Sequence, residues 1–349
     1  MLLLLIFGIL QMLHLVLAEG DGAQWTYTGP RGQNHWSDSY PVCSGKAQSP
    51  INIETSCVIY DASLQPLKSH GYREPEDSTF LLRNDGHTVK VYLPPSMGLR
   101  LPNNYTTTQL HLHWGNSDIK GGAEHQVNGK AFSAELHVVH YNSDDYGSAE
   151  EAKDQPEGLA VLGVLIEVGE GPNLSYDSIL SYLENIKYPG QEVSIPSFNV
   201  RNLLPDQLDQ YYRYRGSLTT PPCYESVLWT VFNQKVQIAE SQLIKLQHAV
   251  YSTGANPVPV PLQNNFRNLQ SLNNRLVYSS FPVGALCVYS AGEIVAIASG
   301  TTLGLLGLSL SIYFLLKRIR AQRKDNVVVF KSSPGAPEMS NLASDTQQP

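Results

Sequence analysis

The stretch that decides the fold reads QLHLHWG (109–115), a glycine-rich break, and then AELHVVH (134–140). Apolar and polar residues alternate in both runs, which predicts two β-strands. On a strand, His111 and His113 point to the same face, and His137 arrives on the second strand. A lone buried histidine usually needs no more than hydrogen bonds, but three imidazoles from neighbouring strands can occupy three corners of a tetrahedron. The fourth corner stays open for water, so this arrangement predicts a catalytic zinc site.

The composition is that of a globular chain. Its 349 residues are 42% hydrophobic and 16% charged, which excludes a wholly disordered protein. The formal net charge of −7 argues against a nucleic-acid partner. The four cysteines lie far from any CxxC spacing, which argues against a zinc ribbon or a thioredoxin-like site. The HExxH motif of zinc proteases is absent from the sequence.

Two apolar segments predict how the chain is organised around a membrane. The first, residues 1–18, is typical of a signal peptide cleaved after Ala18, with a signal anchor as the alternative. The second, residues 294–316, carries no charge and can cross a hydrocarbon core of about 30 Å. Basic residues follow it at once, and such a cluster stays on the cytoplasmic side. We therefore expect a single-pass type I protein of the cell membrane. Its predicted segments after the signal peptide are an extracellular domain (19–282), a stalk (283–293), a transmembrane helix (294–316) and a disordered cytoplasmic tail (317–349).

The remaining segments predict a β-dominated domain. The NDG turn at 84–86 is typical of a hairpin and would join two strand arms within 80–93. The continuous apolar run at 159–168 predicts a buried central strand. Further strands are expected at 49–55, 108–115, 131–141 and 226–237, a strand and a turn within 61–71, helices at 176–186 and 241–247, and an irregular aromatic arm at 24–56. Many short strands with few helices indicate one α+β domain on a large twisted, mostly antiparallel β-sheet, with short peripheral helices plus one transmembrane helix.

Seven motifs occur in the order found in one family. They are SPINI (49–53), NDGH (84–87), QLHLHWG (109–115), EHQVNG (124–129), AELHVVH (134–140), LAVLG (159–163) and SLTTPP (217–222). With these motifs, residues 24–281 resemble an α-carbonic anhydrase, and the two apolar segments make the chain most similar to the membrane-anchored animal members.

The resemblance implies a zinc enzyme. Its zinc ligands would be His111, His113 and His137. Thr219 would orient the nucleophile, Glu124 would hold that threonine in its donor role, and His87 would shuttle protons. Outside the ligands, the resemblance implies imidazole anchors at Gln109, Glu135 and the backbone of Asn265.

The resemblance also implies how the cavity is lined. Carbon dioxide would lie against an apolar wall and two threonines: Val139, Val161, Leu218, Trp229, Thr219 and Thr220. A water path to the shuttle would be bordered by Tyr27, Asn84 and Asp85, where Asp85 stands at a position at which the family often has Asn.

Cysteines, sequons and small residues predict the covalent and oligomeric state. The resemblance implies a disulfide between Cys43 and Cys223, which would tether the SLTTPP loop. Cys57 is expected to be a buried free thiol, whereas Cys287 could pair with its twin in a dimer or stay free. Glycosylation sequons stand at Asn104 and Asn173. The GxxxG spacing at 300–304 predicts a homodimer through the transmembrane helix, although Gly is common in such helices.

The function implied is reversible hydration of carbon dioxide to bicarbonate and a proton at the outer cell surface, for pH and bicarbonate homeostasis. The alternative is a catalytically inactive cell-surface binding module on the same fold. The three histidines, Thr219 and Glu124 are all present, which favours the enzyme. A bicarbonate transporter as partner is compatible with the enzyme.

Overall fold

The computed structural model describes residues 25–73, 75–119, 121–255, 258–283 and 291–325. The chain divides into two compact units, residues 1–287 and 288–349, and each is described by itself. The predicted signal peptide, the end of the tail from 326 and most of the stalk, with Cys287, lie outside the described residues.

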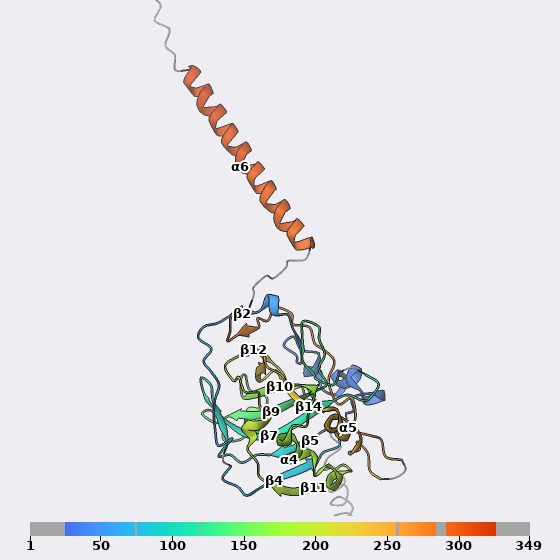
Figure 1. Ribbon diagram of the computed structural model, residues 1–349. Helices are drawn as coiled ribbons and strands as arrows, with labels where there is room; N and C mark the ends of the chain where they lie inside the picture. The colour runs from blue at the N-terminus through green and yellow to red at the C-terminus, as the bar shows by residue number, and fades with distance from the viewer. Residues whose placement is uncertain (1–24, 74, 120, 256–257, 284–290, 326–349) are drawn as a thin grey trace, which may run out of the picture. The chain divides into compact units, whose positions relative to one another are not determined.

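The first unit is built on one large sheet. Its strands, together with a separate pair β1 and β8, are β1 (Asn52–Ile53), β2 (Ile59–Tyr60), β3 (Lys68–His70), β4 (Thr79–Asn84), β5 (Val89–Tyr92), β6 (Gly98–Arg100), β7 (Asn104–Trp114), β8 (Gln126–Val127), β9 (Ala134–Asn142), β10 (Leu159–Gly169), β11 (Glu192–Pro196), β12 (Tyr211–Gly216), β13 (Val227–Phe232), β14 (Val236–Ala239) and β15 (Tyr278–Ser279). Within the described residues, thirteen strands form a sheet in the order β11-β4-β5-β7-β9-β10-β13-β12-β15-β2, with β14 beside β10, β6 beside β7 and β3 beside β6 (Figure 1). Most pairs are antiparallel; β13 and β14 run parallel to β10, and β2 runs parallel to β15. The predicted fold class is confirmed.

The centre of the sheet positions the histidines. Strands β7 and β9 pair antiparallel, so that His111 faces His137 and His113 faces Glu135. The next strand, β10, pairs with β9 and is buried over its first eight residues. A strand covered on both faces reads as a continuous apolar run, which is why the sequence predicts it well. The hairpin of β4 and β5 is also found, with its turn after Asn84.

Two apolar cores cover the two faces of the sheet. Alternate residues along β10 go to opposite cores: Leu162 and Val164 belong to the larger core, and Val161 and Leu165 to the smaller one. Replacing a fully buried leucine such as Leu162 by alanine typically costs about 2–5 kcal/mol. The two cores hold the strands in a register that neither the turns nor the short helices could maintain alone.

The helices are short and peripheral. They are α2 (Trp36–Ser39), α3 (Ala149–Ala152), α4 (Leu174–Leu180) and α5 (Glu240–His248), with 3-10 turns η1 (Gly29–Arg31), η2 (Gln33–His35), η3 (Pro41–Ser44), η4 (Thr55–Cys57), η5 (Leu183–Ile186) and η6 (Val200–Leu203). The helix predicted at 176–186 is in fact two pieces, α4 and η5. It also begins earlier than expected, because the Asn173 side chain caps it by accepting the N–H of Ser175. The helix predicted at 241–247 corresponds to α5.

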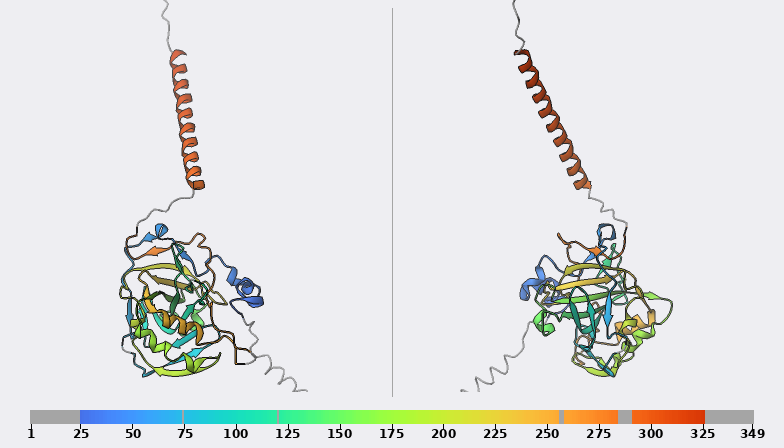
Figure 2. Two further views of the ribbon diagram at one scale, coloured as in Figure 1. Left: turned by 45° about the vertical axis from the view of Figure 1, so that its right-hand side comes forward. Right: turned by 90° about the vertical axis from the view of Figure 1, so that its left-hand side faces the viewer.

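The N-terminal arm is largely irregular, as expected. Its helical turns, blue in Figure 2, lie outside the sheet in both views. The strand expected at 49–55 is reduced to the two residues of β1. Within 61–71, where a strand and a turn are expected, the structure has a turn followed by β3, and β2 lies just before that range.

The second unit contains one long helix, α6 (Ala291–Asp325). Its segment Ala298–Arg320 is long and apolar enough to cross a membrane. This segment overlaps the predicted span 294–316 and is displaced from it by one helical turn.

Candidate metal centre and active site

Three histidines from β7 and β9 converge at the middle of the sheet. The ring centroid of His113 lies 4.9 Å from that of His111 and 4.5 Å from that of His137, and the remaining pair is 5.2 Å apart. Each ring can offer a nitrogen such that all three nitrogens lie within 4.8 Å of one another. The register of two paired strands therefore brings together residues that are 24 positions apart in the sequence.

The outer partners of the three rings decide which nitrogen is free. Nδ1 of His111 lies 2.8 Å from Oε1 of Gln109. Nδ1 of His113 lies 2.7 Å from the Asn265 carbonyl. Nε2 of His137 lies 2.8 Å from Oε1 of Glu135. An acceptor oxygen requires an N–H donor, so each ring keeps its lone pair on the other nitrogen.

Burial favours the neutral form of two of the rings, His111 and His113. Burial and the two neighbouring imidazoles hold the pKa of His111 well below its usual range. Burial also lowers the pKa of His113, although Glu124 acts in the opposite direction. Burial alone would raise the pKa of Glu135, but His125 and His137 hold it well below its usual range. Neutral imidazoles backed by a charged carboxylate are the ligand state that a metal ion needs.

The donor set fits a zinc ion. Nε2 of His113 and Nδ1 of His137 are 3.0 Å apart, and two facing lone pairs at that distance repel unless a cation lies between them. Oε2 of Glu124 lies 3.5 Å from that His113 nitrogen and 3.9 Å from that His137 nitrogen, and it has no hydrogen-bond partner among the described residues. Three neutral nitrogens without thiolate, next to an unpartnered carboxylate oxygen, suit a divalent metal with an open position.

A second set of possible ligands fits less well. His125, Glu135 and His137 also bring donor atoms together. However, Glu135 already accepts from both imidazoles, and Nε2 of His125 lies 2.6 Å from the Tyr214 hydroxyl. His125 thus extends a buried hydrogen-bond chain behind His137 and has a structural role. His140 has a structural role as well, between the Tyr72 hydroxyl and the Ala160 carbonyl.

A cavity of about 300 Å³ opens onto the three histidines. Most residues predicted for the substrate wall and the water path line it, namely Val139, Val161, Leu218, Thr219, Thr220, Trp229, Tyr27 and Asp85, together with His87 and Gln109. Glu124, Glu135 and Asn265 lie behind the lining and are fully or almost fully buried. One wall is thus apolar, while the shuttle candidate and charged groups lie elsewhere around the same cavity.

Asn84 does not belong to this lining. It is fully buried, its amide donates to the carbonyls of Ile186, Lys187 and Tyr251, and its oxygen accepts the N–H of Gly86. The structure therefore places it beneath the turn and not along a path for water.

The turn that carries His87 is held by charged and aromatic neighbours. Oδ1 of Asp85 accepts the N–H groups of His87 and Thr88, and its Oδ2 lies 2.8 Å from Nζ of Lys90. The Trp25 ring stacks on the His87 ring with centroids 3.8 Å apart. Burial lowers the pKa of His87, Asp85 raises it and Lys90 lowers it. The sequence indicates an aromatic arm but contains no signal that Trp25 stacks on His87.

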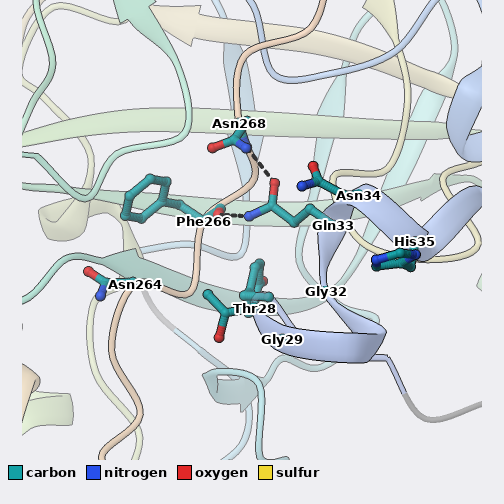
Figure 3. Close-up of a pocket in the computed structure, with 10 residues that line it drawn as sticks. Thr28, Gly29, Gly32, Gln33, Asn34, His35, Asn264, Phe266 and Asn268 are labelled. Carbon is teal, nitrogen blue, oxygen red and sulfur yellow. Dashed lines mark hydrogen bonds between the residues drawn. The ribbon is translucent and has the colours of Figure 1, made fainter.

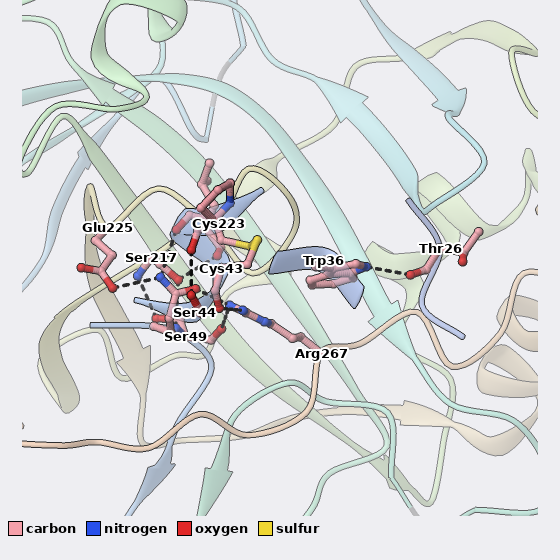
Figure 4. The surroundings of a disulfide bond; sticks show 12 residues. Thr26, Trp36, Cys43, Ser44, Ser49, Ser217, Cys223, Glu225 and Arg267 are labelled. Atoms are coloured by element: carbon pink, nitrogen blue, oxygen red, sulfur yellow. Dashed lines mark hydrogen bonds between the residues drawn. A yellow bond between two sulfur atoms is a disulfide. The ribbon is translucent and has the colours of Figure 1, made fainter. Parts of the chain in front are cut away.

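A disulfide tethers the loop that carries Thr219, and an arginine holds the segment at the other end of that bond. Cys43 and Cys223 are bonded, as predicted, at a sequence separation of 180 (Figure 4). The Arg267 guanidinium, seen beside the disulfide in Figure 4, donates to the carbonyl of Cys43 and to Gln48 and Ser49. Its backbone N–H donates to Oε1 of Glu124. Sequence reasoning missed Arg267, because no motif links it to this loop.

The prediction for Cys57 is wrong. Cys57 is exposed and disulfide-bonded, not a buried free thiol. The 3-10 turn η4 carries it to the surface, where a cysteine is accessible for pairing.

A second cavity, lined by the N-terminal arm, is larger than the histidine cavity but has fewer titratable side chains. Its volume is about 380 Å³, and Gln33 bridges its wall by bonding the Phe266 carbonyl and the Asn268 N–H (Figure 3). Apart from Tyr27 and His35, its lining has no titratable side chain. Size alone therefore does not identify the site.

Both sequon side chains take part in the fold. Nδ2 of Asn104 donates to Asp144, and Nδ2 of Asn173 donates to the Gln237 carbonyl. Attachment of a glycan at either nitrogen would have to replace that hydrogen bond.

Comparisons with known proteins agree with this geometry. The family described as eukaryotic-type carbonic anhydrase matches residues 31–281. The chain is 47% identical to carbonic anhydrase 12 of Homo sapiens over 320 residues, which cover 90% of each chain. It is 40% identical to carbonic anhydrase 6 of Homo sapiens over 78% of this chain and 89% of that one. It is 39% identical to carbonic anhydrase 15 of Mus musculus over 79% of this chain and 88% of that one. With its histidine cluster and sheet, the chain belongs to the eukaryotic-type carbonic anhydrase family.

Proposed function

We propose that this protein is a zinc-dependent enzyme that interconverts carbon dioxide and water with bicarbonate and a proton. The observation that carries the proposal is that three imidazole nitrogens converge at a cavity lined in part by apolar residues, with the unpartnered Oε2 of Glu124 close behind two of them. His111, His113 and His137 would hold the metal. When bound, zinc supplies Lewis acidity and lowers the pKa of water to about 7, for which carbonic anhydrase is the standard example.

The ligand partners keep the imidazoles in the productive state. Gln109, Glu135 and the Asn265 carbonyl hold the N–H groups of the rings, so the rings cannot rotate or exchange tautomers. Carbon dioxide has no dipole, so Val139, Val161, Leu218 and Trp229 hold it loosely without competing hydrogen bonds.

Proton movement falls to residues around the cavity. The unpartnered Oε2 of Glu124 would accept a hydrogen bond from the Thr219 hydroxyl, and the oxygen of Thr219 would then accept a hydrogen bond from the attacking group and orient it. His87 would take the released proton from water in the cavity and pass it to buffer outside. Its lowered pKa favours the neutral form, which is the form that accepts a proton.

We further propose that the enzyme works at the outer cell surface as a single-pass type I membrane protein. Three features support this topology: the apolar segment of α6, the basic residues at its C-terminal end, and a disulfide suited to an oxidising compartment. The segment bounds 1–18, 19–282, 283–293, 294–316 and 317–349 remain part of this proposal. The proposal includes a homodimer formed through small residues of α6. It also includes a bicarbonate transporter as a partner protein.

Stopped-flow hydration of carbon dioxide by the full-length chain in lipid nanodiscs tests the activity. We expect fast hydration that disappears when zinc is chelated and returns when zinc is added. A folded, zinc-loaded protein without hydration activity would contradict the proposal and leave the binding module as the function.

Protease treatment of intact cells tests the topology independently. We expect a C-terminal tag after residue 349 to be protected while the domain is released from the surface. Cleavage of the tag in intact cells would contradict the type I orientation.

A further inference from the structure

A cavity lined by three arginines lies outside the proposed active site. Its volume is about 520 Å³, and its charged lining consists of Arg213, Arg215, Arg275, Asp61 and Glu157. None of these residues lines the histidine cavity. Three arginines and two carboxylates leave one net positive charge in this lining.

Arg213 is the unusual member of the lining. The residue is 7% exposed, and its Nε donates to Oγ1 of Thr230. Its Nη2 is buried and has no hydrogen-bond partner among the described residues. Burial lowers the pKa of the Arg213 guanidinium. A buried charged donor without an acceptor is costly, and native proteins normally provide one.

Among the described residues no carboxylate forms an ion pair with Arg213, although Glu157 acts on it electrostatically and its guanidinium lies over the Tyr211 ring. Glu157 is taken by Arg215, with which it forms an ion pair. Asp61 accepts from the backbone and hydroxyl of Ser63. The Arg275 guanidinium donates its hydrogen bonds to backbone carbonyls, those of Leu272, Arg215, Gln48 and Ser271. It therefore adds positive charge to the cavity but does not need an anion to satisfy its hydrogen bonds.

The remaining lining is apolar and aromatic. It consists of Leu64, Pro102, Leu228, Leu276, Tyr214 and Tyr278. A cavity of this size, mostly apolar with a few convergent polar groups, is typical of small-molecule sites. A guanidinium recognises a planar carboxylate particularly well.

We propose that this cavity binds a small organic carboxylate, with the carboxylate on Arg213 and the hydrocarbon part against the leucines. One negative charge would neutralise the net charge of the lining. A dianion such as phosphate would give the cavity an excess negative charge. It also has no hydrocarbon part that could pack against the apolar wall. The site is independent of the proposed reaction.

Fluorine NMR with 4-fluorobenzoate as the probe tests the proposal on the full-length chain in nanodiscs. A carboxylate could also bind at a metal, so the titration is run with zinc present and after chelation. We expect saturable binding that persists after chelation. Binding that vanishes when zinc is removed would overturn the proposal.

Matched variants assign the binding to Arg213. Arg213→Gln should weaken 4-fluorobenzoate at least tenfold, and Arg213→Lys should weaken it less. Arg83→Gln is the control, because Arg83 also has a buried Nε without a partner but does not line this cavity. Equal affinity in Arg213→Gln and Arg83→Gln would contradict the proposal.

Two further measurements keep the result interpretable. Circular dichroism and thermal unfolding establish that Arg213→Gln folds; if it does not, Arg213→Lys and the neutral probe decide. That probe, 4-fluorobenzamide, has the same shape without the charge and should bind at least tenfold more weakly. Equal affinity for the two probes would show that the cavity does not recognise a carboxylate.

Discussion

The proposed metal site is defined by which ring nitrogen of His111, His113 and His137 is already engaged in a hydrogen bond. The amide of Gln109, the carbonyl of Asn265 and the carboxylate of Glu135 each occupy one ring nitrogen. What remains is a set of lone pairs that face one another, with Oε2 of Glu124 beside them. If the ring nitrogens that now bond these partners were the free ones, the three lone pairs would point away from one another.

Thr219→Ala tests the orienting role proposed for the hydroxyl. Carbon dioxide hydration should fall by about a hundredfold, because one preorganised hydrogen bond at the reacting group is lost. The zinc content should stay the same, since Thr219 holds no ligand. Thr220→Ala, the adjacent threonine of the same cavity, should have a much smaller effect. Equal losses in the two variants would mean that Thr219 has no special role.

The Asp85–Lys90 ion pair should tune His87 in opposite directions. Asp85→Asn removes the charge that raises the pKa of His87, and Lys90→Met removes the one that lowers it. Because neutral His87 accepts the proton, hydration at low buffer should begin at lower pH in Asp85→Asn and at higher pH in Lys90→Met. The double variant should lie between them. A His87 NMR titration that is identical in all variants would contradict this tuning.

At the scale of elements, the register of β7 against β9 decides whether there is a site. Successive side chains of a strand point to opposite faces, so a shift by one residue would turn His137 away from the β7 histidines. The two cores specify the register, because the same shift would also expose buried residues such as Leu136 and Val138. Glu135 adds a second constraint by accepting the N–H groups of Glu124 and His125 from the preceding loop.

Glu135→Gln tests this link between strand and loop. An amide cannot accept all four of the N–H groups that point at the carboxylate, so the orientation of His137 should loosen. Zinc affinity, measured by competition with a chromophoric chelator, should fall by about 10–100-fold. Glu167→Gln on β10, which forms an ion pair with Lys130 away from the histidines, is the matched control. Unchanged affinity in Glu135→Gln would show that the carboxylate does not support the metal.

At the scale of the whole domain, distant segments are tied together around the Thr219 loop. The Cys43–Cys223 disulfide joins the N-terminal arm to that loop across 180 residues. Arg267 connects the same arm to Glu124. The site therefore depends on contacts between parts of the chain that fold from far apart.

Removing the disulfide should destabilise the domain and slow the enzyme together. The double variant Cys43→Ser and Cys223→Ser should lose up to about 5 kcal/mol of unfolding free energy in urea, by the chain-entropy relation for a loop of this length. Hydration should also fall, because the Thr219 loop loses its anchor. Cys57→Ser, which breaks the disulfide of Cys57 but leaves the Cys43–Cys223 bond intact, is the comparison and should keep the Thr219 loop anchored. A double variant with unchanged stability and rate would remove the disulfide from both roles.

The sequence by itself determined the fold class, the central strands and the disulfide between Cys43 and Cys223. It also predicted which residue types line the histidine cavity. These follow from local periodicity and from motifs that stand in a recognisable order, and both are properties of the chain as written. The bounds of individual elements were predicted less accurately. For example, the capping residue Asn173 lies outside the apolar pattern, and the helix begins earlier than that pattern predicts.

Only the tertiary structure decided which atoms remain free. It showed that Oε2 of Glu124 has no partner, that Trp25 stacks on His87, that Asn84 is used inside the turn, and that Cys57 is paired at the surface. It also revealed that Arg213 lines a cavity separate from the histidine cavity. The physical reason is that hydrogen bonding, burial and charge balance depend on neighbours in space, and these neighbours lie tens to hundreds of residues away in the sequence.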